Sequence, residues 1–152
     1  MTMSLDGLRV IDLSTHLSGP YCSMLLGDMG ADVVKVERSE GDDMRHVPPF
    51  AHGESAPFML FNRNKRSVVL DLKSAQSREA CARLASSADV FLGNFRPGVA
   101  ARLELDYATL SRTNPRLIFC SVSGLRSHGP VPRARRLRSH HPGDVGAHVD
   151  HG

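Results

Sequence analysis

The sequence predicts an α/β fold with a Rossmann-like, mainly parallel open sheet. Five short runs rich in valine, isoleucine, leucine and phenylalanine are separated by turn formers and by segments with apolar residues at helical spacing. Strands that alternate with helices are joined by crossovers and therefore run parallel. The hydrophobic share of 41% and the charged share of 23% are typical of a globular domain.

The strands are predicted from composition and boundaries. Short runs rich in β-branched residues and bounded by Gly, Pro, Asn or Ser are typical of strands. We expect strands at residues 8–13, 31–37, 67–72, 89–93 and 116–122.

The helices are predicted from apolar residues that recur every three or four positions. Cys22, Leu25, Leu26 and Met29 share such a face, and Gly30 follows as a stop. Ser74 is suited to cap the helix after it. We expect helices at residues 21–29, 74–85, 97–103 and 107–112, and a long loop without a period at 38–57.

Several classes of protein are excluded or disfavoured. No run approaches the roughly 20 apolar residues that cross a bilayer, and the N-terminus lacks the pattern of a secretory signal. We therefore expect a cytoplasmic protein without a membrane partner. Cys22, Cys81 and Cys120 are odd in number and form no CxxC pair, so we expect buried thiols, no disulfide framework and no metal site.

The chain divides into a Rossmann-like portion at residues 5–125 and a basic tail at 126–152. The tail holds five of the eight histidines and no aromatic residue. It is either a native disordered tail or the product of a shifted reading frame. The excess of arginine over lysine indicates coding DNA rich in G and C, whose shifted reading gives Arg, Pro, Gly and His. This favours the frame shift.

No common nucleotide-binding motif is present. The segment after the first strand, STHLSGPYCSMLLGDMG, contains no GxGxxG, although Glu37 stands where a ribose-binding acid would be expected. There is also no P-loop and no GxSxG hydrolase elbow.

The exits of the predicted strands nevertheless indicate a site for an anionic nucleotide. Ligands of open parallel sheets bind at the carboxyl ends of the strands. Arg38, Lys73 and Arg96 lie at such exits, and Gly19 would allow a close backbone approach before the first helix. Cations and helix N-termini are the groups that bind phosphate.

Four segments carry a family resemblance: LDGLRVIDLSTHLSGPYCSMLLGDMGADVVKVE, NRNKRSVVLDLK, ADVFLGNFRPGVAARL and NPRLIFCSVSGL. In this order and spacing, the chain from Leu5 to about Leu125 resembles the N-terminal part of the class III CoA-transferases, whose relatives include α-methylacyl-CoA racemases. The resemblance implies a homodimer that binds coenzyme A across the strand ends, and a sheet that is incomplete here. It implies that the NRNKRS motif positions strands or a partner subunit.

The resemblance also implies which residues contact the cofactor. Their cations suit phosphates, and an amide can hydrogen-bond the nucleotide. Phe95 and Leu70 offer apolar faces to adenine, although Phe95 is equally well explained as a core residue. The implied cofactor-binding residues are His16, Leu17, Ser18, Arg38, Leu70, Lys73, Asn94, Phe95, Arg96 and Arg102.

The implied reaction transfers CoA between an acyl-CoA and a carboxylic acid acceptor. An aspartate attacks the thioester, giving a mixed anhydride and CoA thiolate, whereas racemase relatives use a His and an Asp as acid and base. That aspartate belongs beyond the matching segments, so no catalytic residue is assigned, and Asp144 and Asp150 of the tail are not candidates. We expect an N-terminal fragment that is truncated and inactive alone.

A non-enzymatic module that binds anions or nucleotides is the alternative from another class. The tail segment ARRLR could attach to nucleic acid, but it lacks interleaved aromatic residues, which disfavours that partner.

Overall fold

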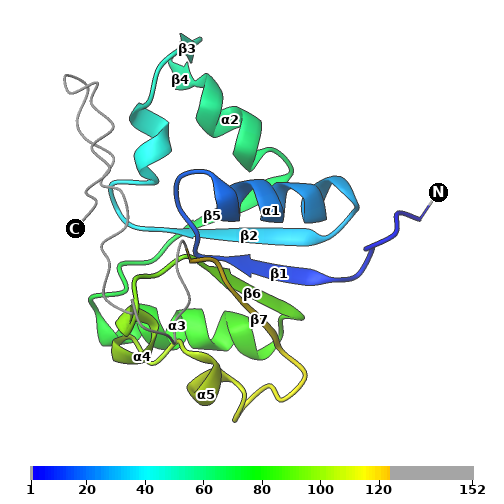
Figure 1. The fold of residues 1–152 in the computed structure, drawn as a ribbon, viewed down its shortest axis with the longest axis vertical. Coiled ribbons are helices and arrows are strands. Elements are labelled where there is room, and N and C mark those ends of the chain that lie inside the picture. Colours follow the sequence, from blue (N-terminus) through cyan, green and yellow to red (C-terminus); the bar gives the residue numbers. More distant parts are fainter. Residues whose placement is uncertain (1, 124–152) are drawn as a thin grey trace, which may run out of the picture.

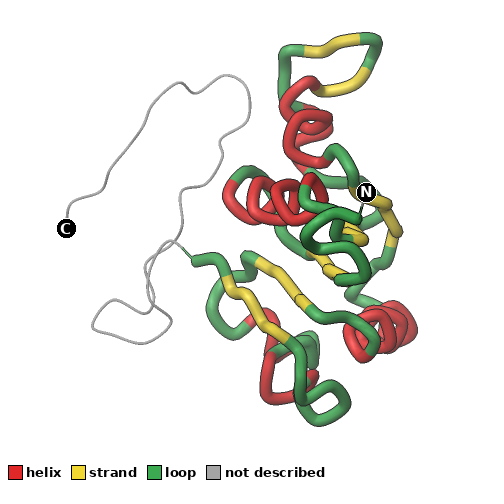
Figure 2. The backbone as a smooth tube through the Cα atoms, turned by 90° about the vertical axis from the view of Figure 1, so that its right-hand side faces the viewer, coloured by secondary structure: helices red, strands yellow, loops and turns green. Residues whose placement is uncertain are grey.

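The computed structural model describes residues 2–123, which form a five-stranded sheet with helices on both faces (Figures 1 and 2). The strand order is β5-β2-β1-β6-β7, and every neighbouring pair is parallel. The strands are β1 (Arg9–Asp12), β2 (Asp32–Glu37), β5 (Lys65–Val69), β6 (Val90–Gly93) and β7 (Ile118–Ser121). The predicted fold class is confirmed, and no strand boundary differs from its prediction by more than three residues. The predicted tail at 126–152 lies outside the described residues.

The helices form a layer on each face of this sheet. Helix α1 (Ser18–Asp28) covers one face, and α3 (Ala75–Ser86), α4 (Val99–Arg102) and α5 (Tyr107–Leu110) cover the other (Figure 1). Helix α1 begins three residues before its prediction, because proline is accepted in a first helical turn. Ser74 caps α3 as expected, since its hydroxyl accepts a hydrogen bond from the Ser77 N–H at 3.1 Å.

The pleat of the strands divides the buried side chains between the two faces. Ile11 and Val34 join Cys81 of α3 in the larger core, whereas Val10 and Val33 pack with Leu26 on the α1 face. Successive residues of a strand point to opposite faces. Apolar residues therefore alternate in direction along β1 and β2, and each helical layer receives its own core.

The segment predicted as a loop at 38–57 contains regular structure, so that prediction was wrong. A short 3₁₀ helix (η1, Asp43–His46) is followed by a hairpin of β3 (Phe50–Ala51) and β4 (Glu54–Ser55), and then by α2 (Ala56–Asn62). Helix α2 packs beside α1. It has only seven residues, and its four consecutive apolar residues at 58–61 show no helical period. Ser55 is the N-cap of α2, and its hydroxyl accepts a hydrogen bond from the Phe58 N–H.

The α1 face changes from apolar to charged toward the carboxyl ends of the strands. Asp12 follows Val10 on this face, and Lys35 and Glu37 follow Val33. All three charged residues are at most 5% exposed. Burial of a charge is costly unless partners surround it, so this layer constrains the structure around it.

Asp12 is the centre of this buried layer. Its carboxylate accepts hydrogen bonds from the Ser14 N–H and hydroxyl, from the Ser23 hydroxyl of α1, and from the Lys65 ammonium of β5 at 3.1 Å. Burial lowers the pKa of Lys65, and the Asp12 carboxylate acts in the opposite direction. One carboxylate thus connects β1, α1 and β5.

The NRNKR residues of the expected motif contact other elements, mainly through their side chains. Four of the five side chains bind an aspartate of β1, α1 or β2, and the other lies within the turn. The motif therefore fixes β5 against its neighbours, in agreement with the expectation that it positions strands. The contacts are Asn62 to Lys65 at 2.9 Å, Arg63 and Asn64 to Asp28 at 2.6 and 2.8 Å, Lys65 to Asp12 at 3.1 Å, and Arg66 to Asp32 at 2.6 Å.

The cysteines only partly match their prediction. Cys81 is buried, and burial raises its pKa to about 12. Cys22 and Cys120 are instead half-buried. Within residues 2–123 no cluster of three metal-ligating side chains occurs, and no helix there has the length and apolarity needed to cross a membrane.

The Asp12–Lys65 pair yields a stability prediction. Replacing Lys65 by Met leaves a buried carboxylate without its counter-charge, so we expect the free energy of unfolding to fall by about 3–5 kcal/mol. Arg66→Met is the matched control, because it removes an exposed ion pair on the adjacent residue and should cost at most about 1 kcal/mol. Urea denaturation followed by circular dichroism measures both. Equal losses would contradict the role given to the buried pair.

Candidate functional site

A cavity of about 480 Å³ opens at the carboxyl ends of the strands. It adjoins β1 and β6, the neighbours between which the order of the strands reverses along the sheet. Ligands of doubly wound sheets bind at this switch point. The cavity is lined by Leu13, Thr15, Lys35, Val36, Glu37, Arg38, Gly41, Asp42, Asp43, Leu70, Asp71, Leu72, Lys73, Phe95, Val99 and Leu103.

One side of the cavity is apolar. Leu70 and Leu72 follow β5, Phe95 follows β6, and Val99 and Leu103 belong to α4 and its end. The ring of Phe95 packs against Gly93, where a Cβ atom would come within 3.1 Å of two ring carbons. A glycine at this position therefore lets the aromatic ring lie at the cavity wall, where it can contact a flat ligand group.

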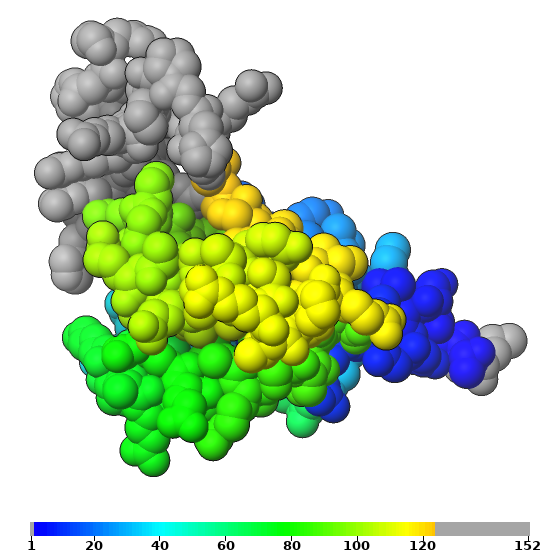
Figure 3. All heavy atoms as spheres, turned by 90° about the horizontal axis from the view of Figure 1, so that it is seen from below, coloured from blue at the N-terminus to red at the C-terminus, as the bar shows by residue number. Residues whose placement is uncertain are grey.

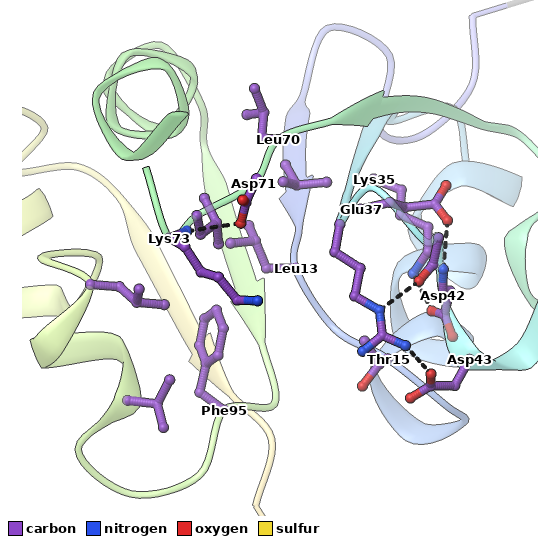
Figure 4. Close-up of a pocket in the computed structure, with 16 residues that line it drawn as sticks. Leu13, Thr15, Lys35, Glu37, Asp42, Asp43, Leu70, Asp71, Lys73 and Phe95 are labelled. Atoms are coloured by element: carbon purple, nitrogen blue, oxygen red, sulfur yellow. Dashed lines mark hydrogen bonds and ion pairs between the residues drawn. The ribbon is translucent and has the colours of Figure 1, made fainter. Parts of the chain in front are cut away.

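The other side is charged, and most of its charges are already paired. Figure 4 shows Lys35, Glu37, Asp42 and Asp43 together, across the cavity from Lys73 and Phe95. The Lys35 ammonium lies 2.7 Å from the Asp42 carboxylate, and both side chains are at most 2% exposed. This pair is fixed, because separating it would leave two buried charges.

Glu37 is held by four hydrogen bonds. Arg45 binds both carboxylate oxygens at 2.7 and 2.8 Å, the Ser67 hydroxyl donates at 2.5 Å, and the Asp42 N–H donates at 2.9 Å. Burial alone would raise the pKa of Glu37, but these donors outweigh it and lower the pKa to about 2. Glu37 therefore acts as a structural anion. Its position at the end of β2 gives no support to a ribose-binding role.

Lys73 is the exception among the cations of the cavity. Within residues 2–123 its ammonium has no ion pair, and its own hydrogen bonds run through its main chain, to the Asp71 carboxylate and from Arg78. The side chain is exposed. A cation without a carboxylate partner at the mouth of a cavity is available to an anionic ligand.

The structure brings together four of the ten predicted cofactor-binding residues. Arg38, Leu70, Lys73 and Phe95 line the cavity. The other six do not line it: His16 and Asn94 are half-buried, and the remainder are exposed. These six are His16, Leu17, Ser18, Asn94, Arg96 and Arg102.

Asn94 has a different environment from the one expected. Its amide nitrogen donates to the Thr15 carbonyl at 2.8 Å, and its amide oxygen accepts from the Thr15 N–H at 3.1 Å. Both polar atoms of the side chain thus bind the main chain of the loop after β1. Asn94 joins the two strand exits that flank the switch point.

Position 19 requires glycine for a reason other than the expected approach of a ligand. A Cβ atom at this position would lie 2.2 Å from the Ser14 Cβ, which is an impossible contact. The close approach that requires glycine is therefore between α1 and the exit of β1. It does not by itself indicate a ligand.

Several cavity residues were missed by the sequence reasoning. Thr15, Asp43, Leu72 and Val99 line the cavity but carry no motif of their own. Thr15 and Leu72 lie within the predicted strand exits, next to His16 and Lys73, but neither was singled out as a site residue. Asp43 belongs to the segment wrongly predicted as an irregular loop.

The pKa of Glu37 generates a pH prediction. A folded-state pKa of about 2, against the usual 4.5, means that this carboxylate stabilises the fold above pH 4.5 and loses that contribution as the pH falls toward 2. We expect Glu37→Gln to lower the urea midpoint at pH 7, and the difference from the wild type to shrink between pH 4.5 and 2.

Glu79→Gln is the matched control for this pH series. Glu79 is exposed and pairs with Arg83 of the same helix at 3.7 Å, so its variant should follow the wild type at every pH. A constant difference between Glu37→Gln and the wild type across the series would contradict the prediction.

Comparison with known proteins assigns the chain to a family. The sequence profile of CoA-transferase family III matches residues 5–138. The succinyl-CoA:mesaconate CoA-transferase of Haloarcula hispanica is 48% identical over 126 residues, covering 80% of this chain and 32% of the relative. The succinyl-CoA:glutarate CoA-transferase of Mus musculus is 40% identical over 129 residues, covering 84% of this chain and 30% of the relative.

A solved structure agrees with these sequences. A CAIB/BAIF family protein from Brucella suis superposes with a TM-score of 0.81 and 41% identity, covering 86% of this chain and 36% of that one. The chain spans about a third of the length of the relatives it matches. On the profile match, the identities and the shared fold, this chain belongs to CoA-transferase family III.

Proposed function

We propose that this chain binds coenzyme A or an acyl-CoA at the cavity, as the CoA-binding part of an enzyme that transfers CoA from an acyl-CoA to a carboxylic acid. The observation that carries the proposal is the cavity itself, in which an aromatic and aliphatic wall adjoins Lys73, whose ammonium has no ion pair within residues 2–123. Ligand cavities of this size are typically apolar with a few well-placed polar groups. The names of the relatives support a transferase over the racemase alternative.

The cavity offers groups that suit both chemistries of a nucleotide. An adenine ring can lie against Phe95 and Leu70, which offer apolar surface without competing hydrogen bonds. Lys73 and Arg38 can approach the phosphates as cations. We propose that the remaining predicted residues, His16, Leu17, Ser18, Asn94, Arg96 and Arg102, support or extend the site beyond the cavity, with Asn94 acting through the Thr15 main chain.

The chemical step requires a carboxylate nucleophile, and no described residue is assigned that role. Among the acids of the cavity, Glu37 and Asp42 are fixed by Arg45 and Lys35 and are not available for attack on a thioester. The family resemblance implies that the nucleophile is an aspartate beyond the four matching segments. The residues that select the acyl group and the acceptor acid are expected in that part of the enzyme as well.

The remaining features follow from the same resemblance. We propose a homodimer for the full-length enzyme and a Rossmann-like CoA-binding portion at residues 5–125. A cytoplasmic location stays a prediction. The mass of the purified protein by light scattering coupled to size-exclusion chromatography tests the oligomeric state.

Calorimetry with coenzyme A tests the proposed site through Lys73. Lys73→Met removes this cation from the cavity, and a lost charge-assisted hydrogen bond is worth about 1.5–3 kcal/mol. We therefore expect the dissociation constant for coenzyme A to rise by about 10- to 100-fold. Binding of pantetheine, which lacks the nucleotide, should not change.

Arg83→Met is the control variant, since it removes one exposed cation from α3 at a position that does not line the cavity. Its affinity for coenzyme A should match the wild type. Wild-type binding to coenzyme A no tighter than to inorganic phosphate would reject the proposed function.

A further inference from the structure

Arg38 is engaged by acidic and carbonyl oxygens of its own loop. Its guanidinium donates to the Asp43 carboxylate and, at 3.1 Å, to the Gly41 carbonyl, and it lies 3.8 Å from the Glu40 carboxylate. Arg38 and Asp43 both line the cavity. The arginine that would meet a ligand phosphate is therefore already bound to an anion of the protein.

Asp43 lies between two of the predicted cofactor-binding residues. One of its oxygens contacts Arg38, and the other lies 3.9 Å from the His16 Nε2 atom. Arg38 follows β2, whereas His16 follows β1. The carboxylate thus faces side chains from two neighbouring strand exits, as a bound phosphate group at the sheet edge would.

Burial distinguishes Asp43 from the other acids of the cavity. The Asp42 and Glu37 side chains are 1% and 2% exposed, whereas the side chains of Asp43 and Arg38 are 48% and 56% exposed. Exposed ion pairs contribute at most about 1 kcal/mol, so this pair can be exchanged for another anion at little cost. A buried pair cannot.

We propose that Asp43 is a stand-in anion. It pairs with Arg38 when no ligand is bound, and a phosphate group of the ligand replaces it at Arg38. Asp43 then sets the affinity of the site, because every binding event must first break the Arg38–Asp43 pair. The inference rests on the proposed function for the identity of the ligand, coenzyme A. The exchange of anions at Arg38 is independent of the proposed function.

The first test measures coenzyme A binding by calorimetry. Asp43→Asn keeps the shape of the side chain and removes its charge, so we expect the dissociation constant to fall by about 3- to 5-fold. The double variant Arg38→Met/Asp43→Asn should lose this gain relative to Arg38→Met, because the effect acts through Arg38.

Glu40→Gln is the matched control for general electrostatics. Glu40 is in the same turn and 3.8 Å from Arg38, but its side chain is 72% exposed and does not line the cavity. Its variant should change the dissociation constant by less than about twofold. Equal gains from Asp43→Asn and Glu40→Gln would overturn the proposal, as would a gain that persists without Arg38.

The second test needs no ligand. Phenylglyoxal modifies accessible arginines, and peptide mapping by mass spectrometry gives the rate at Arg38. We expect this rate to rise at least threefold in Asp43→Asn and to stay near the wild-type rate in Glu40→Gln. An unchanged rate in Asp43→Asn would overturn the proposal.

The two tests also separate the two proposals. Faster modification in Asp43→Asn, together with tighter binding of inorganic pyrophosphate but no binding of coenzyme A, would support the role of Asp43 and reject the proposed function. Binding of coenzyme A with equal affinity to the wild type and Asp43→Asn would reject the role of Asp43 and leave the proposed function intact.

Discussion

The fold depends on one buried carboxylate and the donors that surround it. Asp12 has no exposed surface, so its charge must be compensated inside the protein. The compensation comes from three elements at once: the turn after β1 through Ser14, helix α1 through Ser23, and β5 through Lys65. Meeting this requirement fixes the exit of β1 against α1 and holds the first residue of β5 in place. Lys35 extends the same layer by donating to the Ser14 carbonyl at 2.8 Å, and thereby links the buried charges to the cavity.

The sheet could be predicted from sequence because its signals are local. Runs such as residues 31–37 are buried on both faces, and strands of that kind read as continuous apolar segments. The Lys35 and Glu37 side chains interrupt the run at positions that point to one face, and this gives the charged layer described above. Helix α2 could not be predicted, because seven residues with apolar side chains on every side give no period. Its position depends on contacts with α1, which are distant in sequence.

The site could be predicted only in part, for a similar reason. Strand exits are recognisable in sequence, and four residues at these exits, Arg38, Leu70, Lys73 and Phe95, line the cavity. Whether a polar side chain faces a ligand or the protein depends on neighbours across the sheet. Glu37 binds Arg45, which belongs to the segment wrongly predicted as a loop. No local pattern in the sequence indicates this contact. Side chains with the same chemistry thus divide into structural and accessible groups only when the tertiary contacts are known.

The bonds between Asn94 and the Thr15 main chain bear on how the protein can accommodate a ligand. They connect the exit of β1 to the exit of β6, the two strands from which the sheet grows in opposite directions. These bonds hold the two halves of the sheet together at the edge where the proposed ligand would bind, so the halves cannot separate there. The protein must then adjust to a ligand through the exposed side chains around the cavity. Because the strands are rigid, only these few side chains lose conformational entropy when the ligand binds.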